Sequence, residues 1–179
     1  MLNINFNPFP GLTTERLILR QLSIEDEHEI FFLRTDESVN KFLDRDKANT
    51  IEDAREFINK INDGVTKNES ILWAITFKNN NKLIGTICFW KISKQLDKAE
   101  IGYELLPDFQ GKGIMQEAMA VVIKYGLEQL KLHTIEAELS NKNLQSVKLL
   151  ERNGFTVKEN VFHEGSHLET VVYTLINKK

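Results

Sequence analysis

Cysteine is almost absent from this chain, since Cys88 is the single cysteine among 179 residues. One thiol cannot form an intramolecular disulfide, and it cannot supply the paired cysteines of a zinc site. We interpret Cys88, which lies in a predicted strand, as a small buried hydrophobe rather than as a nucleophile. A chain without disulfides suits a reducing compartment, so we expect a cytoplasmic location.

The chain also lacks a long apolar run. Although 41% of its residues are hydrophobic, no stretch approaches the roughly 20 apolar residues that a membrane span needs. Residues 1–11 show no basic segment followed by an apolar one, so we expect neither a signal peptide nor a membrane partner. Length and composition predict one domain over residues 1–179.

No charge of one sign dominates the sequence. The 23 Lys and Arg residues nearly balance the 26 Asp and Glu residues, and the formal net charge is −3. Such a surface has no overall attraction for phosphate backbones, so we expect no nucleic-acid binding of its own. Nothing in the composition indicates an oligomeric state.

Hydrophobic periodicity predicts an α/β domain of the α+β type, with a mixed, mostly antiparallel sheet of about seven strands and about four flanking helices. The predicted strands span residues 17–20, 72–77, 83–92, 99–106, 134–139, 155–158 and 171–176. Two of the helices follow Ser23 and Thr50, each with an aspartate three residues later in the manner of a capping box. The other two span residues 114–130 and 143–152.

Residues 104–118, ELLPDFQGKGIMQEA, are the most informative segment. A predicted strand stops at Pro107, a turn containing Gly111 and Gly113 follows, and a predicted helix begins at once. Backbone N–H groups in such a turn, with the positive end of the helix dipole, form a site for a pyrophosphate. Glycine is needed because a β-carbon would keep the phosphate oxygens away from the amides.

Other phosphate-binding motifs are excluded by the residues present. A Walker A loop is missing, and the turn lacks the third glycine of the dinucleotide motif G-x-G-x-x-G. Taken alone, the segment could also be an ordinary turn.

Two segments resemble the GNAT acetyltransferase superfamily. Residues 110–115, QGKGIM, resemble its coenzyme A loop, Q/R-x-x-G-x-G/A, with Met115 in place of a small residue. Residues 143–155 resemble the signature N-x-x-S…E-K-x-G-F, with Arg152 in place of the lysine. Further upstream, residues 14–20, 73–75, 84–87 and 99–103 resemble the RimJ/RimL-like subgroup of ribosomal-protein N-terminal acetyltransferases.

The resemblance implies a single GNAT-like domain that acts as an N-acetyltransferase, with acetyl-CoA as co-substrate and no metal. The implied acceptor is a primary amine, foremost a protein or peptide N-terminus. A small amine, such as a polyamine, aminoglycoside or amino acid, is the alternative, and a catalytically weak acetyl-CoA-binding protein is a third. The implied coenzyme A contacts are Leu105, Leu106, Gln110, Gly111, Lys112, Gly113, Ile114, Met115, Asn143 and Ser146.

The resemblance also implies catalytic residues. Glu100, on the strand before the glycine turn, is the candidate base, and Glu104 on the same strand face is the second candidate. For either, a solvated strand carboxylate is the alternative. Many family members carry an acid tyrosine where this chain has Leu150, so Ser146 becomes the candidate proton donor to sulfur. Local hydrogen bonding at the helix start is the alternative for Ser146.

The strand of residues 99–106 carries two further expectations. In the family, strand amides polarise the thioester carbonyl, here around Leu105 and Leu106. Gly102 suggests a bulge that would separate this strand from residues 134–139 and admit the pantetheine arm.

Residues 163–167, HEGSH, formally match the zinc motif H-E-x-x-H. That motif requires a helix, whereas this segment contains Gly165 and joins two predicted strands. We therefore predict a polar loop there and no metal site. Phe42 and Trp73 are candidates to line a substrate groove.

Overall fold

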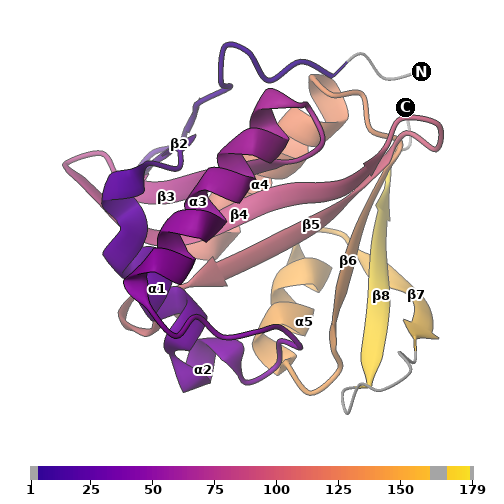
Figure 1. The fold of residues 1–179 in the computed structure, drawn as a ribbon. Coiled ribbons are helices and arrows are strands. Elements are labelled where there is room, and N and C mark those ends of the chain that lie inside the picture. Colours follow the sequence, from indigo (N-terminus) through magenta and orange to yellow (C-terminus); the bar gives the residue numbers. More distant parts are fainter. Residues whose placement is uncertain (1–3, 162–168, 178–179) are drawn as a thin grey trace.

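Eight strands form one sheet within residues 4–161 and 169–177, which the computed structural model describes (Figure 1). The strands are β1 (Leu12–Thr13), β2 (Leu17–Gln21), β3 (Ile71–Phe77), β4 (Asn80–Ser93), β5 (Lys98–Leu105), β6 (Thr134–Ser140), β7 (Thr156–Val161) and β8 (Thr170–Ile176). The helices are α1 (Glu27–Thr35), α2 (Glu37–Asn40), α3 (Ile51–Thr66), α4 (Ile114–Glu128) and α5 (Leu144–Arg152), with 3-10 turns η1 (Ile24–Asp26) and η2 (Pro107–Phe109).

The predicted α/β domain with a mixed, mostly antiparallel sheet is confirmed. The strand order is β1-β2-β3-β4-β5-β6-β8-β7, and β5 with β6 is the parallel pair in this order. The sequence did not indicate β1 and α2, which are two and four residues long. Elements that short span only about one hydrophobic period, so no repeat is present in the sequence to indicate them.

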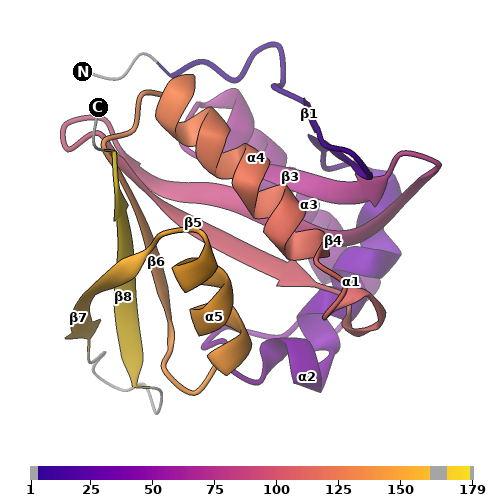
Figure 2. The same cartoon turned by 180° about the vertical axis from the view of Figure 1, so that it is seen from behind.

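Helices cover both faces of the sheet. In Figure 1, α1 and α3 lie in front of it, and Figure 2 shows α4 and α5 on the opposite face. Strand β3 supplies both cores because its side chains alternate. Leu72 belongs to the core with Ile58 of α3, whereas Trp73 belongs to the core with Met119 of α4. Trp73 is therefore a core residue.

Strands β5 and β6 diverge part-way along their length. They pair from Lys98 with Thr134 to Glu100 with Glu136, and then β5 stays with β4 while β6 stays with β8. The predicted separation of the strands is confirmed, but the bulge predicted at Gly102 is wrong, because its pairing with Cys88 of β4 continues the register without a shift. A β-carbon on Gly102 would lie 3.1 Å from the Cys88 sulfur, so glycine there provides space for that side chain.

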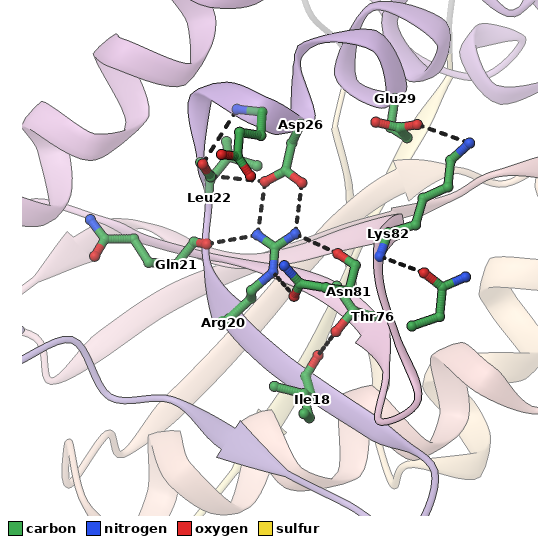
Figure 3. A network of polar contacts seen from close by, with 12 residues as sticks. Ile18, Arg20, Gln21, Leu22, Asp26, Glu29, Thr76, Asn81 and Lys82 are labelled. Carbon is green, nitrogen blue, oxygen red and sulfur yellow. Dashed lines mark hydrogen bonds and ion pairs between the residues drawn. The ribbon is translucent and has the colours of Figure 1, made fainter.

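A polar network fixes the N-terminal half of the fold (Figure 3). Arg20 of β2 donates two hydrogen bonds to the carboxylate of Asp26, at 2.8 and 2.7 Å. The same guanidinium donates to the side chain and the carbonyl of Asn81 at the start of β4, each at 2.8 Å. Because the Asp26 side chain is only 5% exposed, this bidentate pair joins β2, η1 and the β3–β4 hairpin in a largely dry setting.

Candidate active site

The turn between β5 and α4 has the backbone geometry of a phosphate site. Gly111 and Gly113 have φ values of +71° and +73°, a left-handed region that side chains disfavour. Gly113 is the N-cap of α4 and has no side chain that could cap the first turn. The first N–H groups of α4 and the positive end of its dipole are therefore suited to an anion.

Hydrogen bonds hold this turn from both sides. The side-chain amide of Gln110 donates to the carbonyl of Leu105 at 2.9 Å. From the N-terminal segment, the guanidinium of Arg16 donates to the carbonyl of Lys112 at 3.3 Å and pairs with the carboxylate of Glu117 in α4. The turn is thus fixed before any ligand binds.

A cavity of about 660 Å³ extends from the turn and is lined by residues of β5, α4, α5 and the region of α2. Eight of the ten predicted coenzyme A contacts line it: Leu105, Gln110, Gly111, Gly113, Ile114, Met115, Asn143 and Ser146. The structure does not bring Leu106 into it, because the Leu106 side chain packs in the core under α1 and α3 and its N–H donates to the carbonyl of Ile84 at 2.9 Å. Lys112 lies at the turn, with its ammonium group 5.9 Å from the ring centre of Phe109.

Three cationic residues line the same cavity: Lys142, Lys148 and Arg152. They lie on α5 or just before it, so they add positive charge to the side opposite the glycine turn. The spacing of Lys148 and Arg152, four residues apart on one helix face, was the sequence signal for this pair.

The two candidate carboxylates have different surroundings. Glu104 lines the cavity, and its Oε2 atom accepts a hydrogen bond from Arg45 at 2.7 Å. Glu100 does not line the cavity, and its Oε2 atom lies 2.9 Å from the Lys91 ammonium group. Burial raises the pKa of Glu100, while Lys91 lowers it less strongly. Among the described residues that line the cavity, Glu104 is the one carboxylate.

At the start of α5, Asn143 and Ser146 both line the cavity. The side-chain oxygen of Asn143 accepts the backbone N–H of Ser146 at 3.2 Å, so Asn143 is the N-cap of α5. The Ser146 side chain lies near Tyr103 of β5, another residue of the cavity wall. Burial raises the pKa of Tyr103 to about 12, against a smaller lowering by the nearby Ser146 hydroxyl, so the phenol keeps its proton at ordinary pH.

The sequence did not indicate Tyr103 as a site residue, because the resemblance places the acid tyrosine on α5. This chain has Leu150 at that position, and Leu150 is buried in the core. The available signal was strand alternation, which turns Tyr103 to the face opposite Glu104 and toward α4 and α5. In the loop around residues 36–49 the sequence singled out Phe42 alone, and its neighbours Ser38, Val39 and Leu43 line the cavity together with it.

The described part of the chain holds neither a metal-binding cluster nor a membrane-spanning helix. No group of three or more His, Cys, Asp or Glu residues there is placed to hold a metal ion. The HEGSH segment, residues 163–167, lies outside the described residues, so the predicted absence of a metal stays a prediction. None of the described helices has the length and apolar character needed to cross a bilayer.

Sequence comparisons identify the family of this chain. Residues 16–156 match the family described as Acetyltransferase (GNAT) domain. The uncharacterized N-acetyltransferase YoaA of Bacillus subtilis (strain 168) is 30% identical over 175 residues, which cover 96% of this chain and 99% of YoaA. The ribosomal-protein-serine acetyltransferase of Escherichia coli (strain K12) is 33% identical over 78 residues, 44% of each chain.

A solved structure has a similar fold. The ribosomal L7/L12 alpha-N-protein acetyltransferase RimL, in complex with coenzyme A, superposes with a TM-score of 0.83 at 19% identity, covering 93% of this chain and 98% of RimL. The fold, the glycine turn and the family match lead to one conclusion. This chain belongs to the GNAT family and is a GNAT-type N-acetyltransferase.

Proposed function

We propose that this enzyme transfers the acetyl group of acetyl-CoA to the N-terminal α-amine of a protein or peptide. One observation carries the choice of acceptor. Glu104, the carboxylate that lines the cavity, is already paired with Arg45 at 2.7 Å. The cavity therefore offers limited help in removing a proton from a strongly basic amine.

The cavity residues fit coenzyme A along its length. The N–H groups of the glycine turn suit the pyrophosphate, and the side chains of Lys148 and Arg152 add positive charge for the phosphates. Beyond Glu100, the edge of β5 that faces β6 is not paired with a strand, so it can bond the pantetheine amides as an added strand would. Acetyl-CoA supplies the activated thioester.

Of the two amides predicted to polarise the thioester carbonyl, Leu105 is the better placed. The N–H of Leu106 donates to Ile84 of β4. Successive residues of an antiparallel strand bond to opposite sides. The N–H of Leu105 is thus directed away from β4, toward the side from which β6 has diverged.

Glu104 is the proposed partner of the acceptor amine, in preference to Glu100. One of its oxygens is held by Arg45, and the other has only a long hydrogen bond, 3.4 Å, from the hydroxyl of Thr86. That second oxygen can accept a proton from the amine directly or through one water. Glu100 stays the alternative base from the sequence, with its carboxylate occupied by Lys91.

The protonation of the acceptor decides between amine classes. At pH 7.5, about a quarter of an α-amine with a pKa near 7.9 is neutral, against about 0.1% of a lysine-type amine with a pKa near 10.4. Because Arg45 compensates the charge of Glu104, the site suits an α-amine, a good part of which is already neutral, better than a lysine-type amine. The likeness to the ribosomal-protein-serine acetyltransferase of Escherichia coli also supports a protein acceptor.

The test is the release of the coenzyme A thiol with three matched acceptors at neutral pH. One is a lysine-free peptide with a free α-amine, the second has the same sequence with a blocked α-amine and one lysine, and the third is spermidine. We expect the free α-amine peptide to react at least tenfold faster than the other two. A faster reaction with spermidine would replace the proposal with a small-amine acceptor.

A further inference from the structure

The wall of the cavity beyond Glu104 is formed by α2 and the residues that follow it. Val39, Phe42 and Leu43 supply three apolar side chains to this wall, and Ser38 lies beside them. Leu43 is 42% exposed, so much of its apolar side chain is open to a molecule that enters the cavity. An apolar surface thus adjoins the carboxylate proposed to receive the amine.

Hydrogen bonds at its start hold this wall in place. Asp36 is the N-cap of α2, and its Oδ1 atom accepts the backbone N–H of Val39 at 2.9 Å and the hydroxyl of Ser38. Buried Asn40 donates from its side chain to the carbonyls of Leu33 and Asp36, at 2.9 and 2.7 Å. A four-residue helix without these bonds would have little stability of its own.

Arg45 connects the wall to the carboxylate. Its Nε atom donates to Asn40 at 2.8 Å, and its Nη2 atom donates to Glu104 at 2.7 Å. One guanidinium therefore sets the distance between the apolar side chains and the carboxylate of β5. A pocket fixed in this way before binding loses little conformational entropy when an acceptor enters.

We infer that the first residue of the acceptor has an apolar side chain, which packs against Val39, Phe42 and Leu43 while its α-amine lies at Glu104. The inference rests on the proposed function and names a narrower substrate class for the same site. An acidic first side chain would lose its hydration against this wall without gaining a cationic partner from these three residues. An apolar side chain instead stabilises the complex, because its own surface and the apolar wall are both removed from water on binding.

The test compares lysine-free peptides that differ only in their first residue: leucine, methionine, serine and aspartate. Burial of one large apolar side chain predicts kcat/KM values roughly 10- to 100-fold higher for leucine and methionine than for serine. Aspartate should be the poorest acceptor. Equal rates for the four peptides, or a preference for serine or aspartate, would overturn the inference.

Two variants locate the preference in the wall. Phe42→Ala should reduce the leucine-to-serine ratio of kcat/KM several-fold and leave the thermal stabilisation by coenzyme A unchanged. Phe32→Ala is the matched control, because Phe32 is a 49% exposed phenylalanine of α1 that does not line the cavity, and it should keep the wild-type ratio. An unchanged ratio in a folded, coenzyme A-binding Phe42→Ala protein would contradict the inference.

Failure of the proposed function has a different signature. In that case no peptide with a free α-amine would be acetylated, whatever its first residue, while a small amine would react. Acetylation of all four peptides at one rate would sustain the proposed function and reject the apolar pocket alone.

Discussion

Arg16 Nε lies 2.6 Å from Glu117 Oε2, so the N-terminal segment is bonded to the first turn of α4 beside the glycine turn. Glu117 Oε1 also accepts the backbone N–H of Arg16 at 2.9 Å and the hydroxyl of Thr14. Residues 14–20, noted in the sequence for their resemblance, thus include contacts that hold the start of α4 beside the glycine turn.

Glu117→Gln should lower stability by roughly 1–2 kcal/mol near neutral pH, the scale of charge-assisted bonds at a partly exposed site. Burial raises the pKa of Glu117, but the bonds from Thr14 and Arg16 together outweigh it and lower the pKa below 4.5. A lowered folded-state pKa stabilises the protein above the unfolded value, and that contribution is lost as the pH falls through the folded value.

Thermal melts of both proteins across the acid range measure this contribution. The Tm of the wild type should exceed that of Glu117→Gln by the largest amount near neutral pH, and this difference should shrink below about pH 4.5. A difference that grows as the pH falls would show that Glu117 does not stabilise the fold through its charge.

Gly113→Val should abolish the rise in Tm that coenzyme A produces. A β-branched residue at φ +73° is strained, and its side chain would project at the phosphate-binding turn, within van der Waals range of Arg16. The measurement is thermal denaturation with coenzyme A, NAD or ATP. For the wild type we expect a response to coenzyme A alone, and a response to ATP in its place would reject the assignment of the turn.

Glu104→Gln should lower kcat by roughly 10²-fold, the lower end of the usual range for a general acid–base group, because Arg45 already compensates the charge of Glu104. The loss should diminish as the pH rises toward the pKa of the acceptor amine, because the neutral amine needs no base. Glu100→Gln is the comparison on the same strand face, and it should change kcat by less than Glu104→Gln at every pH. The reverse order of the two variants would return the role to Glu100.

Ser146→Ala should lower kcat by a smaller, pH-independent factor, because water can replace a hydroxyl that donates to sulfur. Since the pKa of Tyr103 is raised to about 12 by burial, its phenol stays a neutral donor over the assay range. Tyr103→Phe should therefore also give a pH-independent fall, and little further fall in the Ser146→Ala background. If the kcat loss of the double variant equals the product of the two single losses, the two hydroxyls act separately.

The sequence predicted the parts of the site that depend on local backbone geometry. The glycine turn and the Thr50 capping box are confirmed because turns and caps are set by residues close together in the chain. Strand alternation likewise placed Glu100 and Glu104 on one face. Which of them lines the cavity depends on the point where β6 parts from β5, just after Glu100, and that point is set by tertiary packing.

Two features of the cavity could not be predicted from the sequence: the wall formed by α2 and the residues that follow it, and the closeness of Tyr103 to Ser146. Helix α2 is only four residues long and is stabilised by Asn40 and Arg45 rather than by a hydrophobic period. The contact of Tyr103 with Ser146 joins β5 to α5 across the point where β5 and β6 part. Neither relationship has a local signature in the sequence.

The most direct test of the account is a crystal structure of the protein with coenzyme A bound. We expect the pyrophosphate to accept hydrogen bonds from the backbone N–H groups of the turn at residues 111–115. The pantetheine arm should lie along β5 where β6 has diverged, with the thiol near Ser146. Coenzyme A bound on the α1 and α3 face, or away from the glycine turn, would contradict the account.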